Sequence, residues 1–120
     1  MIARSNAVIP LAGTGAVAGN EGLFILKTGA LAGANASAFG VITEVQPNGG
    51  SASVAVCAGG FAGAVKVKLG EDGSLGDLVG ADADGAADVA ATTVCAQLLE
   101  DGLADELVEA VIFLPFTPAV

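Results

Sequence analysis

The chain has 120 residues, enough for one hydrophobic core but too few for two independent domains. It contains no His, Trp or Tyr, only two Cys and only four Lys or Arg residues, so the commonest general base and the His-activated nucleophile pairs are absent. The net charge of −9, together with so few basic and aromatic side chains, argues against nucleic acid as a ligand.

Short apolar segments separated by glycines follow one another along the chain, and the glycines have no fixed period. Several segments alternate as half-buried strands do: in Val65-Lys66-Val67-Lys68-Leu69 both lysines face one side and the apolar residues the other. We predict seven strands, at residues 7–11, 22–27, 39–45, 51–58, 63–69, 92–99 and 107–114. Seven short strands indicate a mainly β fold with little helix, arranged as a small barrel or sandwich.

The segment 94–111 allows two interpretations. Its leucines, among them Leu98, Leu103 and Leu107, have spacings compatible with one face of a helix. Gly102 in the middle, with strand-like composition on both sides, instead favours a hairpin around an Asp101-Gly102 turn. We therefore expect a hairpin.

The two halves of the chain resemble each other at an offset of 53 to 57 positions. Residues 39–44 and 53–56 are matched by residues 94–100 and 107–111. The similarity predicts two repeat units, 15–58 and 70–114, that share one core within a single β domain spanning residues 15–120. Chance similarity between Gly- and Ala-rich segments is the alternative explanation.

Charge is divided unevenly along the sequence. Residues 1–69 hold four basic and two acidic residues, a balance of +2, whereas residues 70–120 hold eleven acids and no base, a balance of −11. An acidic surface of this kind favours a partner with a basic patch. No membrane partner is expected, because the longest uncharged stretch, 45–65, is interrupted by Pro47, Asn48 and several glycines, and a spanning helix needs about 20 mainly apolar residues.

Two kinds of motif that can carry chemistry are better explained as turns. The glycines of residues 13–19 have G-x-G-x-x-x-G spacing, which differs from the dinucleotide fingerprint, and no helix-forming stretch follows them. The acid pairs at 71–72, 100–101 and 105–106 lie beside glycine or in loop-like composition, where two carboxylates are not held across a cleft. We expect no cofactor and no catalytic residue, hence no enzyme.

A calcium loop is suggested only by its first residues. Asp82, Asp84 and Asp88 place carboxylates close together, but Ala86 and Thr93 occupy positions where an EF-hand has ligands. A solvated Asp-Gly turn explains the segment better, and no metal site is expected.

The remaining signals are apolar. Cys57 and Cys95 are too few for a disulfide framework and are expected to be buried free thiols, as in a cytoplasmically assembled protein. The tail, residues 110–120, carries Phe113, Phe116 and two prolines, and an apolar chain end is expected to dock. It docks either onto its own domain or onto a neighbouring subunit, and both alternatives stay open.

The order of strands and turns resembles that of small bacteriophage capsid decoration (cement) proteins with a β-tulip-like domain. The segments that carry the resemblance are 39–44, the G-x-V-x-V-x-L strand at 63–69, the Gly76-Asp77-Leu78-Val79 turn into a strand, the Asp84-Gly85 turn, 94–100, and the last strand Leu107-Val108-Glu109-Ala110-Val111-Ile112-Phe113. They cover most of the chain and include no invariant reactive group.

The resemblance implies a structural virion protein on the outer surface of the phage capsid. It implies a homotrimer at local three-fold positions that clamps neighbouring major capsid protein subunits. It also implies an N-terminal arm, residues 1–14, with partner contacts at Ile2, Val8, Ile9 and Leu11. A phage tail, fibre or surface β-module that binds a receptor is the alternative, and an enzyme working through distant carboxylates such as Glu44 and Glu100 is a third interpretation.

Overall fold

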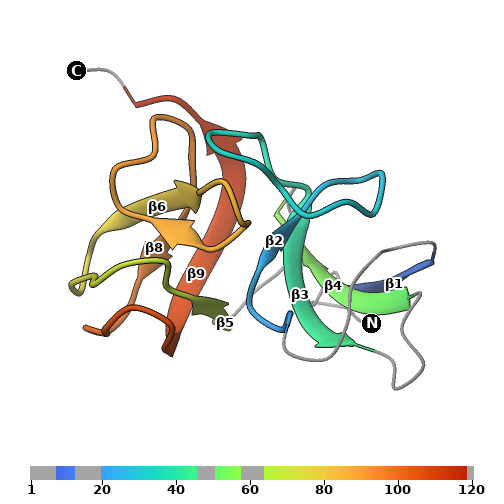
Figure 1. Cartoon of the computed structure of the whole chain (residues 1–120), viewed down its shortest axis with the longest axis horizontal. Coiled ribbons are helices and arrows are strands. Elements are labelled where there is room, and N and C mark those ends of the chain that lie inside the picture. Colours follow the sequence, from blue (N-terminus) through green and yellow to red (C-terminus); the bar gives the residue numbers. More distant parts are fainter. Residues whose placement is uncertain (1–7, 13–19, 46–50, 58–63, 119–120) are drawn as a thin grey trace, which may run out of the picture.

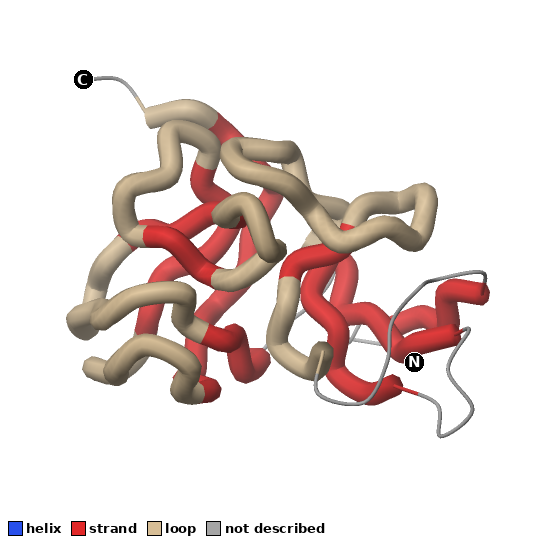
Figure 2. The backbone as a smooth tube through the Cα atoms, viewed as in Figure 1, coloured by secondary structure: helices blue, strands red, loops and turns tan. Residues whose placement is uncertain are grey.

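The structure, a computed structural model, describes residues 8–12, 20–45, 51–57 and 64–118. Within these residues all regular structure is β, without any helix (Figure 1). The strands, in chain order, are β1 (Val8–Ala12), β2 (Phe24–Ile25), β3 (Gly40–Val45), β4 (Ser51–Val56), β5 (Val65–Lys68), β6 (Leu78–Ala81), β7 (Ala87–Asp88), β8 (Val94–Leu98) and β9 (Leu107–Phe116). They form two sheets that lie side by side (Figure 2).

The first sheet contains β1 to β4 in the spatial order β1-β4-β3-β2, and every pair is antiparallel. A register shift in β3 between Ile42 and Glu44 marks a β-bulge. Val41 and Ile42 lie on opposite faces of the sheet, yet neither exposes any of its surface. The middle of the first sheet is therefore covered on both sides.

The second sheet contains the remaining strands in the order β5-β9-β8-β6-β7, again with antiparallel pairs throughout. Its two edges meet at a single parallel bridge between Leu69 and Ala87, where the Gly70 N–H donates to the Ala87 carbonyl (2.9 Å). One bridge does not continue into a ladder, because β7 has only two residues.

The two sheets have the same strand order, and the pairs that involve the strands β4 and β9 have the same register. If β5, β6, β8 and β9 are matched to β1, β2, β3 and β4, both sheets have the strand order 1-4-3-2, and β7 is the one additional strand. Adding 56 to each partner converts Ile9 opposite Val54 into Val65 opposite Ala110. The same addition converts three pairs between β3 and β4 into three pairs between β8 and β9. Gly40 opposite Val56 becomes Ala96 opposite Ile112, Val41 opposite Ala55 becomes Gln97 opposite Val111, and Ile42 opposite Val54 becomes Leu98 opposite Ala110.

A turn in each unit shows the same equivalence. The Leu26 N–H donates to the Ala30 carbonyl (2.8 Å), and 56 residues later the Asp82 N–H donates to the Ala86 carbonyl (2.9 Å). Both turns need a residue with positive φ, and glycine supplies it: Gly29 has φ 97° and Gly85 has φ 84°. We call residues 8–57 the first unit and residues 64–118 the second unit.

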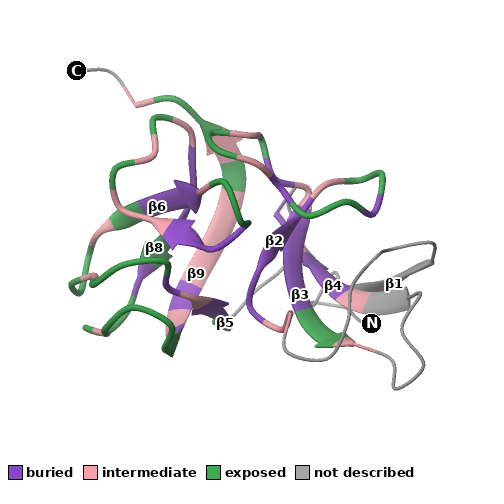
Figure 3. Cartoon of the chain, in the orientation of Figure 1, coloured by how far each residue is buried: buried purple, intermediate pink, exposed green. Residues whose placement is uncertain are grey.

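Two clusters of buried side chains hold the units together. The larger cluster combines Phe24, Val41, Ala55 and Cys57 of the first unit with the inward-facing residues of the second, including Val67, Val79, Leu98 and Val108. The smaller cluster, Ile25, Ile42 and Val54, lies on the other face of the first sheet. Figure 3 shows buried segments in both sheets, with exposed turns around the second. The units therefore share one core, as expected for a domain of this size.

The predicted strand content is confirmed. Each of the seven predicted strands overlaps one observed strand, and the hairpin interpretation of 94–111 is correct, since β8 pairs with β9 and no part of the segment is helical. Two strands are additional: β7 has no counterpart among the predictions, and β6 corresponds only to the turn into a strand that the family resemblance placed at residues 76–79. Both follow short Gly- and Asp-rich stretches without apolar alternation.

The expected barrel is not formed. Both sheets are open, and the described edges of the second sheet meet only at the Leu69 and Ala87 bridge. Closure requires a continuous ladder around the ring, which strands of two and four residues do not provide. The arrangement is two open sheets that pack on a common core.

Candidate interaction surface

The six residues predicted to contact partners lie in different parts of the molecule. Three of them, Val8, Ile9 and Leu11, belong to β1, which pairs with β4 over all five of its residues. That part of the predicted N-terminal arm is thus a strand of the first sheet. Ile2 lies outside the described residues, as do the glycines of 13–19. Phe113 and Phe116 are on β9 in the second sheet.

The two phenylalanines form a contact at the end of β9. Their ring centroids are 5.6 Å apart and the rings are tilted by 44°, a geometry that aromatic pairs favour. Ile112 packs against the larger core and Phe116 is still paired with Val94 of β8, so the tail docks onto its own domain as far as Phe116. Even so, Leu114 is 66% exposed and Phe116 is 47% exposed. The end of β9 therefore leaves apolar surface available for a partner.

A row of side chains crosses the outer face of the second sheet. Leu78 on β6 is opposite Gln97 on β8, and Gln97 is opposite Val111 on β9. Phe113 lies on the same face of β9, two residues after Val111. We call these four residues the second outer face. Leu78 and Gln97 are exposed, and Val111 and Phe113 are half-buried.

The sequence analysis singled out only Phe113 from this face. Leu78, Gln97 and Val111 occur in strands whose composition does not show which side packs on the core. The internal repeat indicates which residues form this row, because residues 54 to 56 positions earlier form the corresponding row of the first sheet, but it does not show that the row is exposed.

The acidic residues of the second unit hold its turns. Asp82 Oδ1 accepts hydrogen bonds from the N–H groups of Asp84 (2.8 Å) and Ala86 (3.0 Å). Asp101 Oδ1 accepts from the Leu75 N–H (2.8 Å) across 26 residues of sequence. Seven of the eleven acids in this unit accept such bonds: Asp72, Asp77, Asp82, Asp88, Glu100, Asp101 and Glu106. Side-chain bonds of this kind fix loop conformation.

The residues considered for calcium do not form a cation site in this geometry. Asp82 and Asp88 each bond backbone N–H groups of their own turns. Among the described residues, no three His, Cys, Asp or Glu side chains gather closely enough to hold a metal ion.

Glu71 lies close to other carboxylates. A side-chain hydrogen bond with Asp88 raises the pKa of Glu71 above its ordinary value of 4.5, and the charges of Asp88, Asp72 and Asp82 raise it further. The bond requires one shared proton, so loss of that proton as the pH rises replaces an attraction by a repulsion.

We expect Glu71→Gln to raise the melting temperature at about pH 7 and to change it little at about pH 4. Because the folded-state pKa of Glu71 is raised, the stabilisation by its hydrogen bond with Asp88 is fully present below the unfolded-state pKa of 4.5. This stabilisation is lost as the pH rises through the folded-state pKa. Thermal unfolding followed by circular dichroism measures this. Asp105→Asn, which removes one exposed charge elsewhere, is the control, and an equal shift in both variants would show that only net charge matters.

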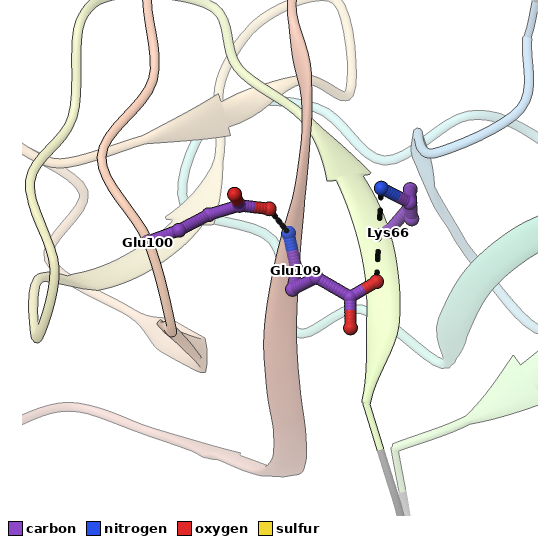
Figure 4. Close-up of polar contacts among 3 residues, drawn as sticks. All are labelled: Lys66, Glu100 and Glu109. Atoms are coloured by element: carbon purple, nitrogen blue, oxygen red, sulfur yellow. Dashed lines mark hydrogen bonds and ion pairs between the residues drawn. The ribbon is translucent and has the colours of Figure 1, made fainter.

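A surface ion pair joins the edge strand β5 of the second sheet to its neighbour β9. Lys66 Nζ lies 3.7 Å from Glu109 Oε2, and Glu100 Oε2 accepts the Glu109 N–H at 2.8 Å (Figure 4). Both ends of the ion pair are about half exposed, so it contributes little to stability. Its position beside the second outer face gives that face a polar border.

Cys57 and Cys95 are free, buried thiols, as predicted. They come from different units, and a side-chain hydrogen bond with Cys57 together with burial raises the pKa of Cys95 far above the ordinary thiol range. Thiolate is the reactive form of cysteine, so neither fold nor electrostatics prepares this thiol for nucleophilic chemistry.

We expect both thiols to react with Ellman's reagent at least about a hundredfold more slowly in the native protein than in denaturant, because reaction requires opening of the shared core. The measurement is the absorbance of released thiolate over time. Reaction of Cys95 at the unfolded-state rate would contradict its burial.

A cavity of about 470 Å³ opens where the two units meet. Its lining is mainly aliphatic, with one carboxylate and one ammonium group at the rim: Glu21, Gly22, Ile42, Thr43, Ala64, Val65, Lys66 and Leu107. The Gly22 carbonyl accepts the Lys68 N–H (2.9 Å) at this junction, which ties the units together. The lining groups include no cysteine or paired carboxylates that would suggest a nucleophile or an acid–base pair.

No helix in the described part of the chain is long and apolar enough to cross a membrane. No protein-family model matches the sequence, and a comparison with curated proteins gives no match either.

Proposed function

We propose that this chain is a structural virion protein that decorates the outer surface of a phage capsid and stabilises it by binding major capsid protein subunits, without catalysing a reaction. The order of strands and turns that resembles the decoration proteins supports the proposal. The observed mainly β domain is compatible with it.

The main observation in favour of a structural function is that the acidic side chains bond backbone N–H groups. In the second unit most carboxylates accept hydrogen bonds from backbone N–H groups of turns. The chain has no His, and its two thiols are buried. Residues that would handle protons in an enzyme are thus occupied with shaping loops, while apolar side chains remain on an outer face.

Attachment to a capsid suits these surfaces. Residues 70–120 carry a charge balance of −11, and this part of the second unit is expected to face a basic patch of the major capsid protein. Assembly as a homotrimer at a local three-fold position would link several weak contacts, so that each later contact forms at high effective concentration. The result is a clamp across neighbouring capsid subunits.

The test is binding of the purified protein to its own expanded capsids that lack it. We expect it to sediment with the capsids and to raise the temperature at which they release DNA, and we expect added salt to weaken the binding. The control is the same binding measurement with purified tails of the same phage in place of the capsids. Absence from the capsids would remove the proposal, and binding only to tails or fibres would favour the receptor-binding alternative.

A further inference from the structure

The internal repeat provides a matched pair of surfaces within one chain. The second outer face corresponds, strand by strand, to a row on the first sheet that we call the first outer face. Phe24 matches Leu78 at an offset of 54, and the remaining pairs match at 56: Val41 with Gln97, Ala55 with Val111, and Cys57 with Phe113.

The two faces differ sharply in burial. Phe24, Val41 and Ala55 expose none of their surface, and Cys57 exposes 2%. On the second outer face, Leu78 is 37% exposed, and no member is fully buried. The outer face is therefore covered in the first unit and left open in the second.

The second unit covers the first outer face together with Ala32 and Ala38 of the first unit's own loop. Phe24, Val41, Ala55 and Cys57 share a buried cluster with residues of the second sheet. The turn of residues 82–86 lies beside Phe24, whose N–H donates to the Gly85 carbonyl (2.7 Å), and the Asn35 N–H donates to the Ala81 carbonyl (3.0 Å).

This contact between units is heterologous, because it uses different surfaces on equivalent units. In an isologous contact both outer faces would be buried against each other. A heterologous contact leaves one complementary surface unused on each end unit. Here the second outer face is exposed, and on the first unit the counterpart of residues 82–86 is the turn 26–30, which carries the exposed Lys27, whereas the counterparts of Val79 and Leu98, Ile25 and Ile42, are buried.

We propose that the second outer face binds the first unit of a second copy of this chain through the 26–30 turn, repeating between chains the turn contact that the two units make within one chain. The turn 26–30 of the second copy would lie beside Leu78 as the turn 82–86 lies beside Phe24. Charge favours this direction of docking, because Lys27 is exposed on the 26–30 turn whereas Asp77 directly precedes Leu78 of the second outer face.

Such a contact gives a closed ring when the rotation between successive units closes and an open filament when it does not. The inference deepens the self-association in the proposed function, and it rests on that part of the proposed function alone. It requires no capsid, so it can fail or succeed independently of capsid binding.

The experiment is sedimentation velocity of the full chain over a range of concentrations. We expect oligomers in the wild type and at least about tenfold weaker association in Leu78→Asp and in Gln97→Arg, which place charge or bulk on the face. Leu103→Asp is the matched control, because Leu103 is 61% exposed but lies in the β8–β9 connection. Circular dichroism and unfolding curves show whether each variant remains folded.

The reciprocal variant tests the other side of the contact. Lys27→Glu leaves the second outer face intact, and we expect it to weaken association in low salt and to differ less from the wild type in high salt. A wild type that stays monomeric at every concentration would overturn the proposal. Oligomers that persist unchanged in both folded face variants would overturn it equally, whatever the result of the capsid-binding test.

Discussion

Phe24→Ala is expected to lower the free energy of unfolding by about 3–5 kcal/mol, because it empties a fully buried site between the two units. The equivalent change in the second unit, Leu78→Ala, is expected to cost about 1 kcal/mol or less, since that side chain is partly exposed. Urea unfolding at a concentration where the chain is monomeric measures both values.

The comparison is informative because the two positions occupy the same place in the repeat. Equal losses at the two positions would mean that both outer faces are buried alike, and the contact between units would then be isologous. A small loss at Phe24 would mean that the larger cluster does not join the two units.

Gly80→Ala is expected to destabilise the fold by about 2–3 kcal/mol. A β-carbon at this position would lie 1.9 Å from the carbonyl oxygen of Thr93 and 3.0 Å from the side chain of Ala91. The carbonyl belongs to the backbone leading into β8, so it cannot move away without disturbing the second sheet. The free energy of unfolding in guanidinium chloride gives the loss.

Gly33→Ala is the matched control for this change. A β-carbon there would have open space around it, and its φ is not positive, so the result is expected to lie between no change and a gain of about 1 kcal/mol. If Gly80→Ala were as harmless as Gly33→Ala, β6 and the start of β8 would not be in the close contact described above.

The strands were predictable where apolar residues alternate over several positions. The pattern of Val65 to Leu69 and the run in β9 carry their own evidence of pairing and sidedness. β7 has only two residues, Ala87 and Asp88, and it pairs because the Asp82 turn folds it back onto β6. The outcome as two open sheets depends on contacts between distant segments, which composition does not reveal.

The candidate surface was predictable only in part. Phe113 and Phe116 stood out as aromatic residues in an apolar tail, and the structure leaves them partly exposed. Leu78 and Val111 did not stand out, because Phe24 and Ala55 have similar local sequence patterns and are fully buried. Which of the two equivalent faces is covered is decided by how the two units pack on each other, a property of the tertiary structure alone.

The acidic second half illustrates the same limit. Its carboxylates were expected to solubilise turns, and the structure adds that they bond particular N–H groups, such as Asp101 with Leu75 and Asp72 with Ala104. The partners lie 26 and 32 residues away in sequence, so local turn rules identify the acids but not the bonds they make.

Cryo-electron microscopy of the phage heads that carry this protein tests the account most directly. Density for the two-sheet domain should lie on the outside of the capsid, with Leu78 and Val111 of each copy covered by the first unit of its neighbour. Heads without such density, or copies that sit on the capsid with this face open to solvent, would contradict it.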